Sequence, residues 1–142
     1  MEMDDSGLMH YYDDVFKAGK LRTIEHAQRW SQGVLETLGV CLDRSTKRAL
    51  AKNLPEELAK SLKGVFWLLH FRDPQMSSLE FQQRAARRSG NTDAEFAYFP
   101  TLAVFSGIKQ YIDSELEDRV SNSLSQEVRE LWQKAERTKT AA

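Results

Sequence analysis

The sequence predicts an all-α protein of about eight helices, built as two pseudo-symmetric four-helix halves that share one core. Two observations support this fold class. Stretches with apolar residues at intervals of three and four alternate with capping and turn residues, which is the period of a helix and not of a strand. The chain also repeats itself at an interval of about 70 residues, so that 8–65 aligns onto 78–135.

The aligned positions share apolar character more than identity, as a common core requires once the surfaces have diverged. The pairs are Tyr11 with Phe81, Val15 with Ala85, Ala27 with Ala97, Val34 with Val104, Leu35 with Phe105, Leu38 with Ile108, Leu42 with Ile112, Leu50 with Val120, Leu54 with Leu124, Leu58 with Val128, and Leu62 with Trp132. A chain of 142 residues suits one compact domain, or two small halves around one core.

The first repeat is expected to span residues 8–71. Its helices are predicted at about 8–18, 23–42, 44–53 and 55–71. Gly19 is a suitable C-cap for the first of them. Pro55 lies in the first turn of the fourth, where its missing N–H costs no hydrogen bond, and an apolar face continues from there to about residue 71.

Residues 72–77 are predicted to be a linker, because Arg72-Asp73-Pro74 interrupts the periodic pattern. The second repeat is expected over 78–137, with helices at about 78–89, 93–113, 115–123 and 125–137. Thr92 and Glu95 form a capping box. Pro100 lies inside the long second helix of this half and predicts a kink or a restarted helix. Short polar ends, residues 1–7 and 138–142, are expected to be flexible.

Composition and charge exclude several classes of protein. The sequence is 41% hydrophobic and 29% charged, which is typical of a globular protein and not of a disordered one. A net charge of −1 does not favour nucleic acid or an acidic membrane as partner. The single cysteine, Cys41, excludes an internal disulfide, and the longest apolar run, Val65–Phe71, is too short to span a bilayer. Without a signal-peptide pattern at the start, a cytoplasmic protein is expected.

Two segments resemble a known family. Leu54-Pro55-Glu56-Glu57-Leu58, preceded by Val34-Leu35-Glu36-Thr37-Leu38, and Phe81-Gln-Gln-Arg-Ala85, followed by Ser89-Gly90, are similar to the bacterial domain-of-unknown-function family numbered 2267. The resemblance covers about residues 8–135, and the second copy departs from it at Leu124-Ser125-Gln126-Glu127-Val128 and at Pro100. It implies a doubled helical fold and no reaction, so no functional residue is carried over.

No catalytic, cofactor-binding or metal-binding residues are expected. His10, Asp13 and Asp14 lie within one helical turn, but a metal site needs three or four convergent ligands, and a solvated acidic helix face is the favoured explanation. His70 ends an apolar stripe and is expected to be a partly buried, hydrogen-bonded histidine. Cys41 falls on the inner face of its helix, without a neighbour that would lower its pKa.

Arg84, Arg87 and Arg88 form the densest basic cluster and are the possible partner-binding residues. Arginine forks match phosphate and carboxylate groups. The alternative is a solvated face that pairs with Glu80 or with the neighbouring half.

A second possible site is the seam between the halves. The segment around Phe66, Trp67 and Phe71 has hardly a polar face, so it is expected to be buried between the halves together with Phe105. The alternative is an exposed groove or pocket, since large exposed apolar surfaces mark binding sites.

These observations favour a non-enzymatic cytoplasmic module that binds an unknown protein partner or itself. One alternative is a carrier or sensor of a small apolar ligand bound between the halves, for which a cavity lined by Trp67, Phe71 and Phe105 would be evidence. Another is an enzyme of unknown reaction, which convergent titratable groups in a cleft would favour. Neither nucleic acid nor a membrane is expected as partner.

Overall fold

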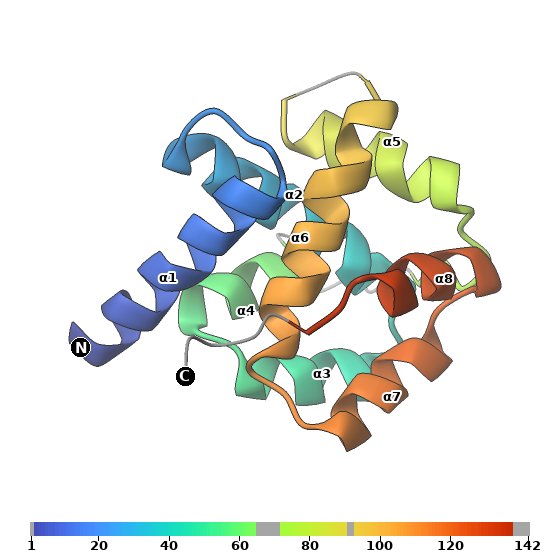
Figure 1. The fold of residues 1–142 in the computed structure, drawn as a ribbon. Helices are drawn as coiled ribbons and strands as arrows, with labels where there is room; N and C mark the ends of the chain where they lie inside the picture. Colours follow the sequence, from blue (N-terminus) through green and yellow to red (C-terminus); the bar gives the residue numbers. More distant parts are fainter. Residues whose placement is uncertain (1, 65–71, 91–92, 138–142) are drawn as a thin grey trace.

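A computed structural model describes residues 2–64, 72–90 and 93–137 of the chain. The described residues form eight α-helices and one short 3-10 helix, with no strand among them, which confirms the all-α class (Figure 1). The elements are α1 (Glu2–Ala18), α2 (Ile24–Cys41), α3 (Arg44–Asn53), α4 (Glu56–Lys63), α5 (Ser78–Arg88), η1 (Glu95–Ala97), α6 (Tyr98–Lys109), α7 (Ser114–Ser123) and α8 (Gln126–Lys134).

Side-chain caps set the starts of most of these helices. At each such start, a side-chain oxygen accepts a hydrogen bond from the backbone N–H three residues further on, which satisfies a donor that the helix leaves free. The capping residues are Thr23, Asp43, Ser77, Asp113 and Ser125. Asp43 and Asp113 occupy equivalent positions in the two repeats. The bounds of α2 and α3 accordingly lie within a residue of those predicted.

The fourth helix is shorter than predicted. α4 ends at Lys63 because Gly64 takes a φ of 79°, a left-handed conformation that suits glycine. The N–H of Gly64 donates to the carbonyls of Lys60 and Ser61 and closes the last turn. The apolar pattern alone carried the predicted helix through this glycine to residue 71, and residues 65–71 lie outside the described residues.

The first helix also differs from its prediction. It begins at Glu2 and not near residue 8. After its end, the residue with positive φ is Lys20, at 57°, and not Gly19. A side chain at position 19 would place its Cβ 2.7 Å from the Val15 carbonyl oxygen, so the glycine is required by close approach.

The helix predicted over 93–113 is divided, as Pro100 indicated. It begins with η1 at Glu95 and continues as α6, in which Pro100 lies in the first turn and needs no N–H partner. Thr92, half of the predicted capping box, lies outside the described residues. The N–H of Glu95 instead donates to Oδ1 of Asp93 at 3.0 Å.

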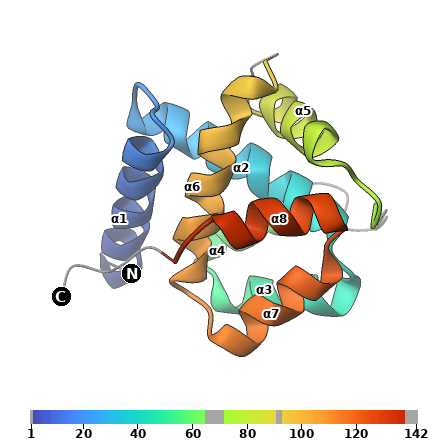
Figure 2. The ribbon, with the colours of Figure 1, turned by 45° about the vertical axis from the view of Figure 1, so that its right-hand side comes forward.

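Helices α2 and α6 form the centre of the molecule (Figures 1 and 2). The first helix of each half contacts the second helix of the other half: α1 packs on α6, and α5 packs on α2. The pairs α2 with α6 and α3 with α7 also contact each other. An internal two-fold axis would produce these contacts, and superposition of the halves stays a prediction.

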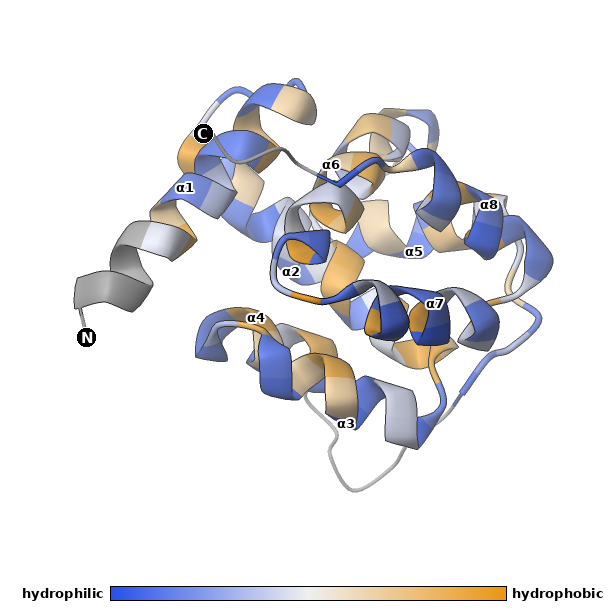
Figure 3. Ribbon diagram, turned by 60° about the horizontal axis from the view of Figure 1, so that its bottom comes forward, coloured by the Kyte–Doolittle hydropathy of each residue, from blue (hydrophilic) through white to orange (hydrophobic). Residues whose placement is uncertain are grey.

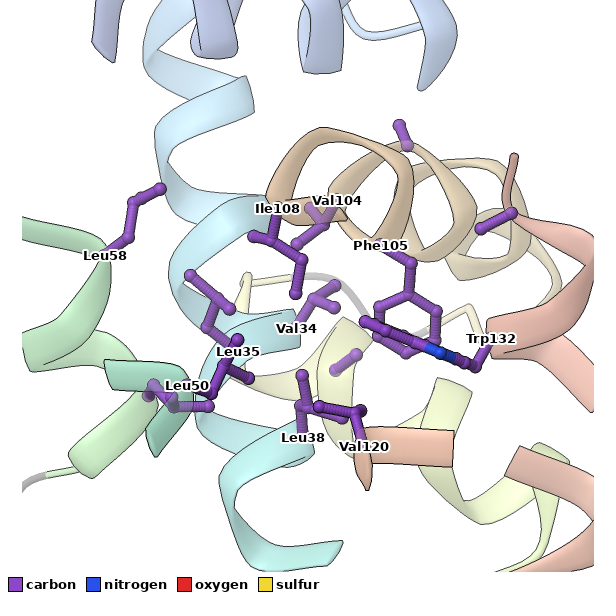
Figure 4. Close-up of a cluster of buried hydrophobic side chains, with 14 of the residues drawn as sticks. Val34, Leu35, Leu38, Leu50, Leu58, Val104, Phe105, Ile108, Val120 and Trp132 are labelled. Carbon is purple, nitrogen blue, oxygen red and sulfur yellow. The ribbon is translucent and has the colours of Figure 1, made fainter. Parts of the chain in front are cut away.

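One hydrophobic core contains residues of both halves. Figure 4 shows Val34, Leu35 and Leu38 of α2 close to Val104 and Ile108 of α6. Every residue of the aligned apolar pairs is buried, with at most 8% of its surface exposed. In Figure 3 the short helices α3, α4 and α7 carry both hydrophilic and hydrophobic residues, as expected for helices with one buried face.

Candidate functional site

Two phenylalanines, one in η1 and one in the first turn of α6, are unusually exposed. Phe96 and Phe99 leave 43% and 46% of their surface accessible, whereas phenylalanine is among the residues most often buried. Beside them is a surface hollow of about 310 Å³. We call its lining the aromatic patch; it consists of Gly19, Lys20, Asp93, Glu95, Phe96 and Phe99.

The fold assembles this patch from two segments that are far apart in sequence. Since α1 contacts both α2 and α6, the turn after α1 lies against the start of α6. The ring centroid of Phe96 lies 6.0 Å from that of buried Trp30. The ring centroid of Phe99 lies 5.3 Å from that of Tyr98, with the two rings edge to face. Both aromatic rings are therefore anchored on one side and open on the other.

Charged groups surround the two rings. The amine of Lys20 lies 4.3 Å from the ring centroid of Phe99, within the range of a cation–π interaction. Asp93 and Glu95 add two carboxylates to the lining. The patch thus combines aromatic faces, one resident ammonium group and two acidic side chains.

The sequence repeat gives an internal comparison for these positions. In the same alignment, Phe96 corresponds to His26 and Phe99 to Arg29. His26 is half-buried and Arg29 exposed, so the first half accepts polar residues where the second has phenylalanine. The apolar pattern did not predict this patch, because an apolar run does not show which of its faces is covered by other helices. A comparison of equivalent positions in the two repeats, polar in the first and aromatic in the second, could have indicated it.

The structure distributes the arginine cluster along α5. Arg84 pairs with Glu80 one turn earlier and lies 3.7 Å from Asp73, and Arg88 lies 3.7 Å from Glu36 of α2. Arg87 is exposed. Two of the three side chains thus make contacts within the chain, as the alternative interpretation expects, and a role in partner binding stays a prediction.

The predicted seam is described in part. Phe66, Trp67 and Phe71 lie outside the described residues. Phe105 is fully buried, and its ring centroid lies 5.6 Å from that of Phe81 and 5.2 Å from that of Trp132. In the described part of the chain, Phe105 belongs to a filled core.

The residues considered for chemistry form no catalytic arrangement in the part of the chain that the structure describes. Cys41 is buried, and burial raises the pKa of its thiol to about 12, so the thiol is protonated at neutral pH. Nε2 of His10 lies 3.5 Å from a carboxylate oxygen of Asp14, one turn on. His70 lies outside the described residues. Within residues 2–64, 72–90 and 93–137, no three potential ligand residues gather into a metal site.

The sequence pattern did not predict that one lysine, Lys109, would be buried. Lys109 is only 2% exposed, and its amine donates to the carbonyls of Trp132 and Ala135 and lies 3.6 Å from Glu117. Burial lowers the pKa of this amine, while Glu117 opposes the shift. Because the acceptors are carbonyls at the end of α8, Lys109 attaches that helix to α6 and serves the fold.

A second polar network joins the linker to both halves. Arg72 donates to the carbonyls of Cys41 and Ser123, and the hydroxyl of Ser123 donates to a carboxylate oxygen of Asp43 at 3.0 Å. The N–H of Asp73 donates to the carbonyl of Val40. These bonds hold the end of α2 against the end of α7.

Comparison with known proteins identifies the family and no activity. Residues 9–131 match the family model described as "Uncharacterized conserved protein (DUF2267)", so the chain belongs to this family and the resemblance is confirmed. No curated protein matches the chain. Among the described residues, no helix combines the length and the apolar character needed to cross a membrane.

Proposed function

We propose that this protein is a non-enzymatic binding module that recognises another protein through the aromatic patch. The observation that carries the proposal is the exposure of Phe96 and Phe99 beside a hollow in the surface. An apolar aromatic centre with a charged rim is the usual composition of a protein–protein interface. Aromatic residues also supply much of the binding energy at such interfaces.

The internal repeat argues that these side chains are not retained for folding. Since His26 and Arg29 occupy the equivalent positions, the helical plan does not demand phenylalanine there. Full burial of a phenylalanine stabilises by about 1.5–3 kcal/mol. Phe96 and Phe99 leave nearly half of that surface in water, and a partner that covers them recovers it.

The state of Cys41 agrees with two parts of the proposal, the non-enzymatic role and the location in the cytoplasm. The raised pKa of Cys41 makes it a poor nucleophile. A single buried free thiol also suits a reducing compartment such as the cytoplasm, where we place the protein.

Site-specific photo-crosslinking in the native host tests the proposal. The photoreactive residue p-benzoylphenylalanine replaces Phe99 in one variant and Arg29, the equivalent exposed position of the first half, in a control. We expect a covalent adduct with a different protein from position 99 and none from position 29. Equal adducts from both positions, no adduct, or an adduct with a second copy of this chain would overturn the proposal.

A further inference from the structure

We infer that the aromatic patch binds a lysine or arginine side chain of the partner protein, in the place that its own Lys20 amine now occupies. This inference rests on the proposed function and adds the chemistry of the partner. The alternative, a purely apolar segment, is an outcome of the test below.

The first argument is the resident cation. The Lys20 amine lies 4.3 Å from the ring centroid of Phe99, well inside the distance of about 6 Å at which ring faces attract ammonium groups. This face of Phe99 therefore already accommodates a cation within the chain. Lys20 is exposed, and an exposed contact of this kind is weak enough to be exchanged for another cation.

The second argument is charge complementarity. The lining of the hollow contains the carboxylate of Glu95 and the ammonium group of Lys20, while Asp93 accepts the N–H of Glu95. If the amine of Lys20 swings into solvent, the hollow keeps two aromatic rings and the negative charge of Glu95. That combination favours a cation over a neutral or acidic side chain.

The third argument is size. A volume of about 310 Å³ is at the lower end of binding hollows, which suits one side chain of a peptide and not a large ligand. The inferred occupant is thus one basic residue within a longer contact.

Two fluorescent peptides provide the probe. Both have the sequence Ala-Phe-X-Phe-Ala with blocked ends, where X is lysine in one and uncharged norleucine, of similar length, in the other. Fluorescence polarisation of each peptide is measured with the full chain at low salt, where exposed charges are least screened.

Three variants separate the roles of the lining residues. Lys20→Asn removes the competing amine and keeps a residue type that tolerates a positive φ. Phe99→Leu removes the ring face, and Glu95→Gln removes one carboxylate. Lys52→Asn on α3, another exposed lysine outside the patch, is the control for net charge.

We expect the lysine peptide to bind more tightly than the norleucine peptide. Its affinity should rise about two- to fivefold in Lys20→Asn, the factor that an exposed cation–π contact represents, and should not change in Lys52→Asn. Phe99→Leu and Glu95→Gln should each weaken it. Thermal melts of all variants confirm that each is folded.

Two results would overturn the inference. One is equal affinity of the protein for the two peptides, and the other is a lower affinity of the Lys20→Asn variant than of the unchanged protein for the lysine peptide. The second result would mean that Lys20 itself contacts the ligand. Photo-crosslinking from position 99 distinguishes the two levels of failure. If a partner is still captured there, the proposed function stands and its partner has another chemistry; if none is captured, both fail.

Discussion

At the scale of single residues, the buried Lys109 has the most specific role in the fold. Its amine donates to the carbonyls of Trp132 and Ala135 at the end of α8. The Trp132 carbonyl also accepts the N–H of Ala135, whereas the Ala135 carbonyl lies beyond the last helical turn. In the first repeat the equivalent position is Gly39, so this buried position holds a glycine in one half and a lysine in the other. A lysine there reads from sequence as a solvated residue in the last turn of a helix, because charged side chains are rarely fully buried.

Replacing Lys109 with methionine should destabilise the protein. The change keeps most of the side-chain volume and removes the amine donor from both carbonyls. The Trp132 carbonyl keeps the N–H of Ala135, so the expected cost is about 1–3 kcal/mol, the cost of one buried unsatisfied group. Urea unfolding at pH 7 measures the free-energy difference. Lys134→Met, an exposed control on α8, should change it by less than about 0.5 kcal/mol. Equal effects of the two variants would show that Lys109 does not hold α8 in place.

Asp43 predicts a dependence of stability on acid pH. Hydrogen bonds from the Thr46 N–H first, and then from the hydroxyls of Thr46 and Ser123, lower the pKa of its carboxyl below 3.8. Because the folded pKa is the lower one, the stabilisation is complete above pH 3.8 and is lost as pH falls through the folded pKa.

Asp43→Ala should cost about 1–2 kcal/mol at neutral pH through loss of the helix cap. The difference from the natural protein should shrink as the pH falls below about 4, since the protonated carboxyl no longer gains from these donors. Free energies of unfolding of the variant and of the natural protein, measured from pH 2.5 to 7, give this difference at each pH. A difference that is constant over this range would show that the charge of Asp43 contributes nothing.

At the scale of elements, glycines set how closely the helices approach. A Cβ at Gly39 of α2 would lie 2.2 Å from the carbonyl oxygen of Leu62 in α4, and one at Gly33 would lie 2.9 Å from that of Ala85 in α5. The Cβ at Gly33 would also lie 2.4 Å from the hydroxyl oxygen of Ser89. The carbonyl oxygens are backbone atoms, which move only with their helices. These contacts allow α2 to lie against α4 and α5 together.

Gly39→Ala should therefore destabilise the protein by about 1–3 kcal/mol, the usual cost of overpacking. Gly7→Ala is the matched control, because nothing lies within 4 Å of its added Cβ and alanine favours the helix α1 by up to about 1 kcal/mol. Thermal unfolding of the two variants should show opposite shifts. A stabilised Gly39→Ala would mean that α2 and α4 are not in close contact.

The sequence predicted helix positions better than helix ends. The bounds of α2 and α3 follow from apolar residues at intervals of three and four and from the caps Thr23 and Asp43. The predicted fourth helix ran beyond Gly64, because the apolar period continues past the glycine while the left-handed backbone that ends α4 is not visible in the pattern. The position of Pro100 indicated a restart, which η1 and α6 confirm.

The candidate site was harder to predict than the fold. Phe96 and Phe99 belong to an apolar stretch whose residues mostly enter the core, and periodicity does not distinguish a covered face from an open one. Lys20 is brought to Phe99 only by tertiary packing of the turn after α1. The arginines of α5, which stood out in the sequence, are paired in part with neighbouring carboxylates.

At the scale of the whole molecule, the two halves are interlocked and not merely adjacent. Each first helix packs on the second helix of the opposite half, and one core contains Leu38 of the first half and Ile108 of the second. Neither half keeps its partners if separated. The protein should therefore unfold in a single cooperative transition.

Leu38→Ala and Ile108→Ala test this cooperation. Both side chains are fully buried, so each truncation should cost about 2–5 kcal/mol and lower the same single transition. Calorimetry measures the number of transitions and their midpoints. Two separate transitions, with each change moving only one, would mean that the halves fold independently.

The central claim is that Phe96 and Phe99 are surplus to the fold and available to a partner. The most direct measurement is the free energy of unfolding of the double variant Phe96→Gln/Phe99→Gln, compared with that of Phe105→Ala at the buried position. The account predicts a loss of about 1–1.5 kcal/mol for each half-covered ring of the double variant, against about 3–5 kcal/mol for the single change Phe105→Ala. A double variant as unstable as Phe105→Ala would show that the aromatic patch is part of the core, and would contradict the account.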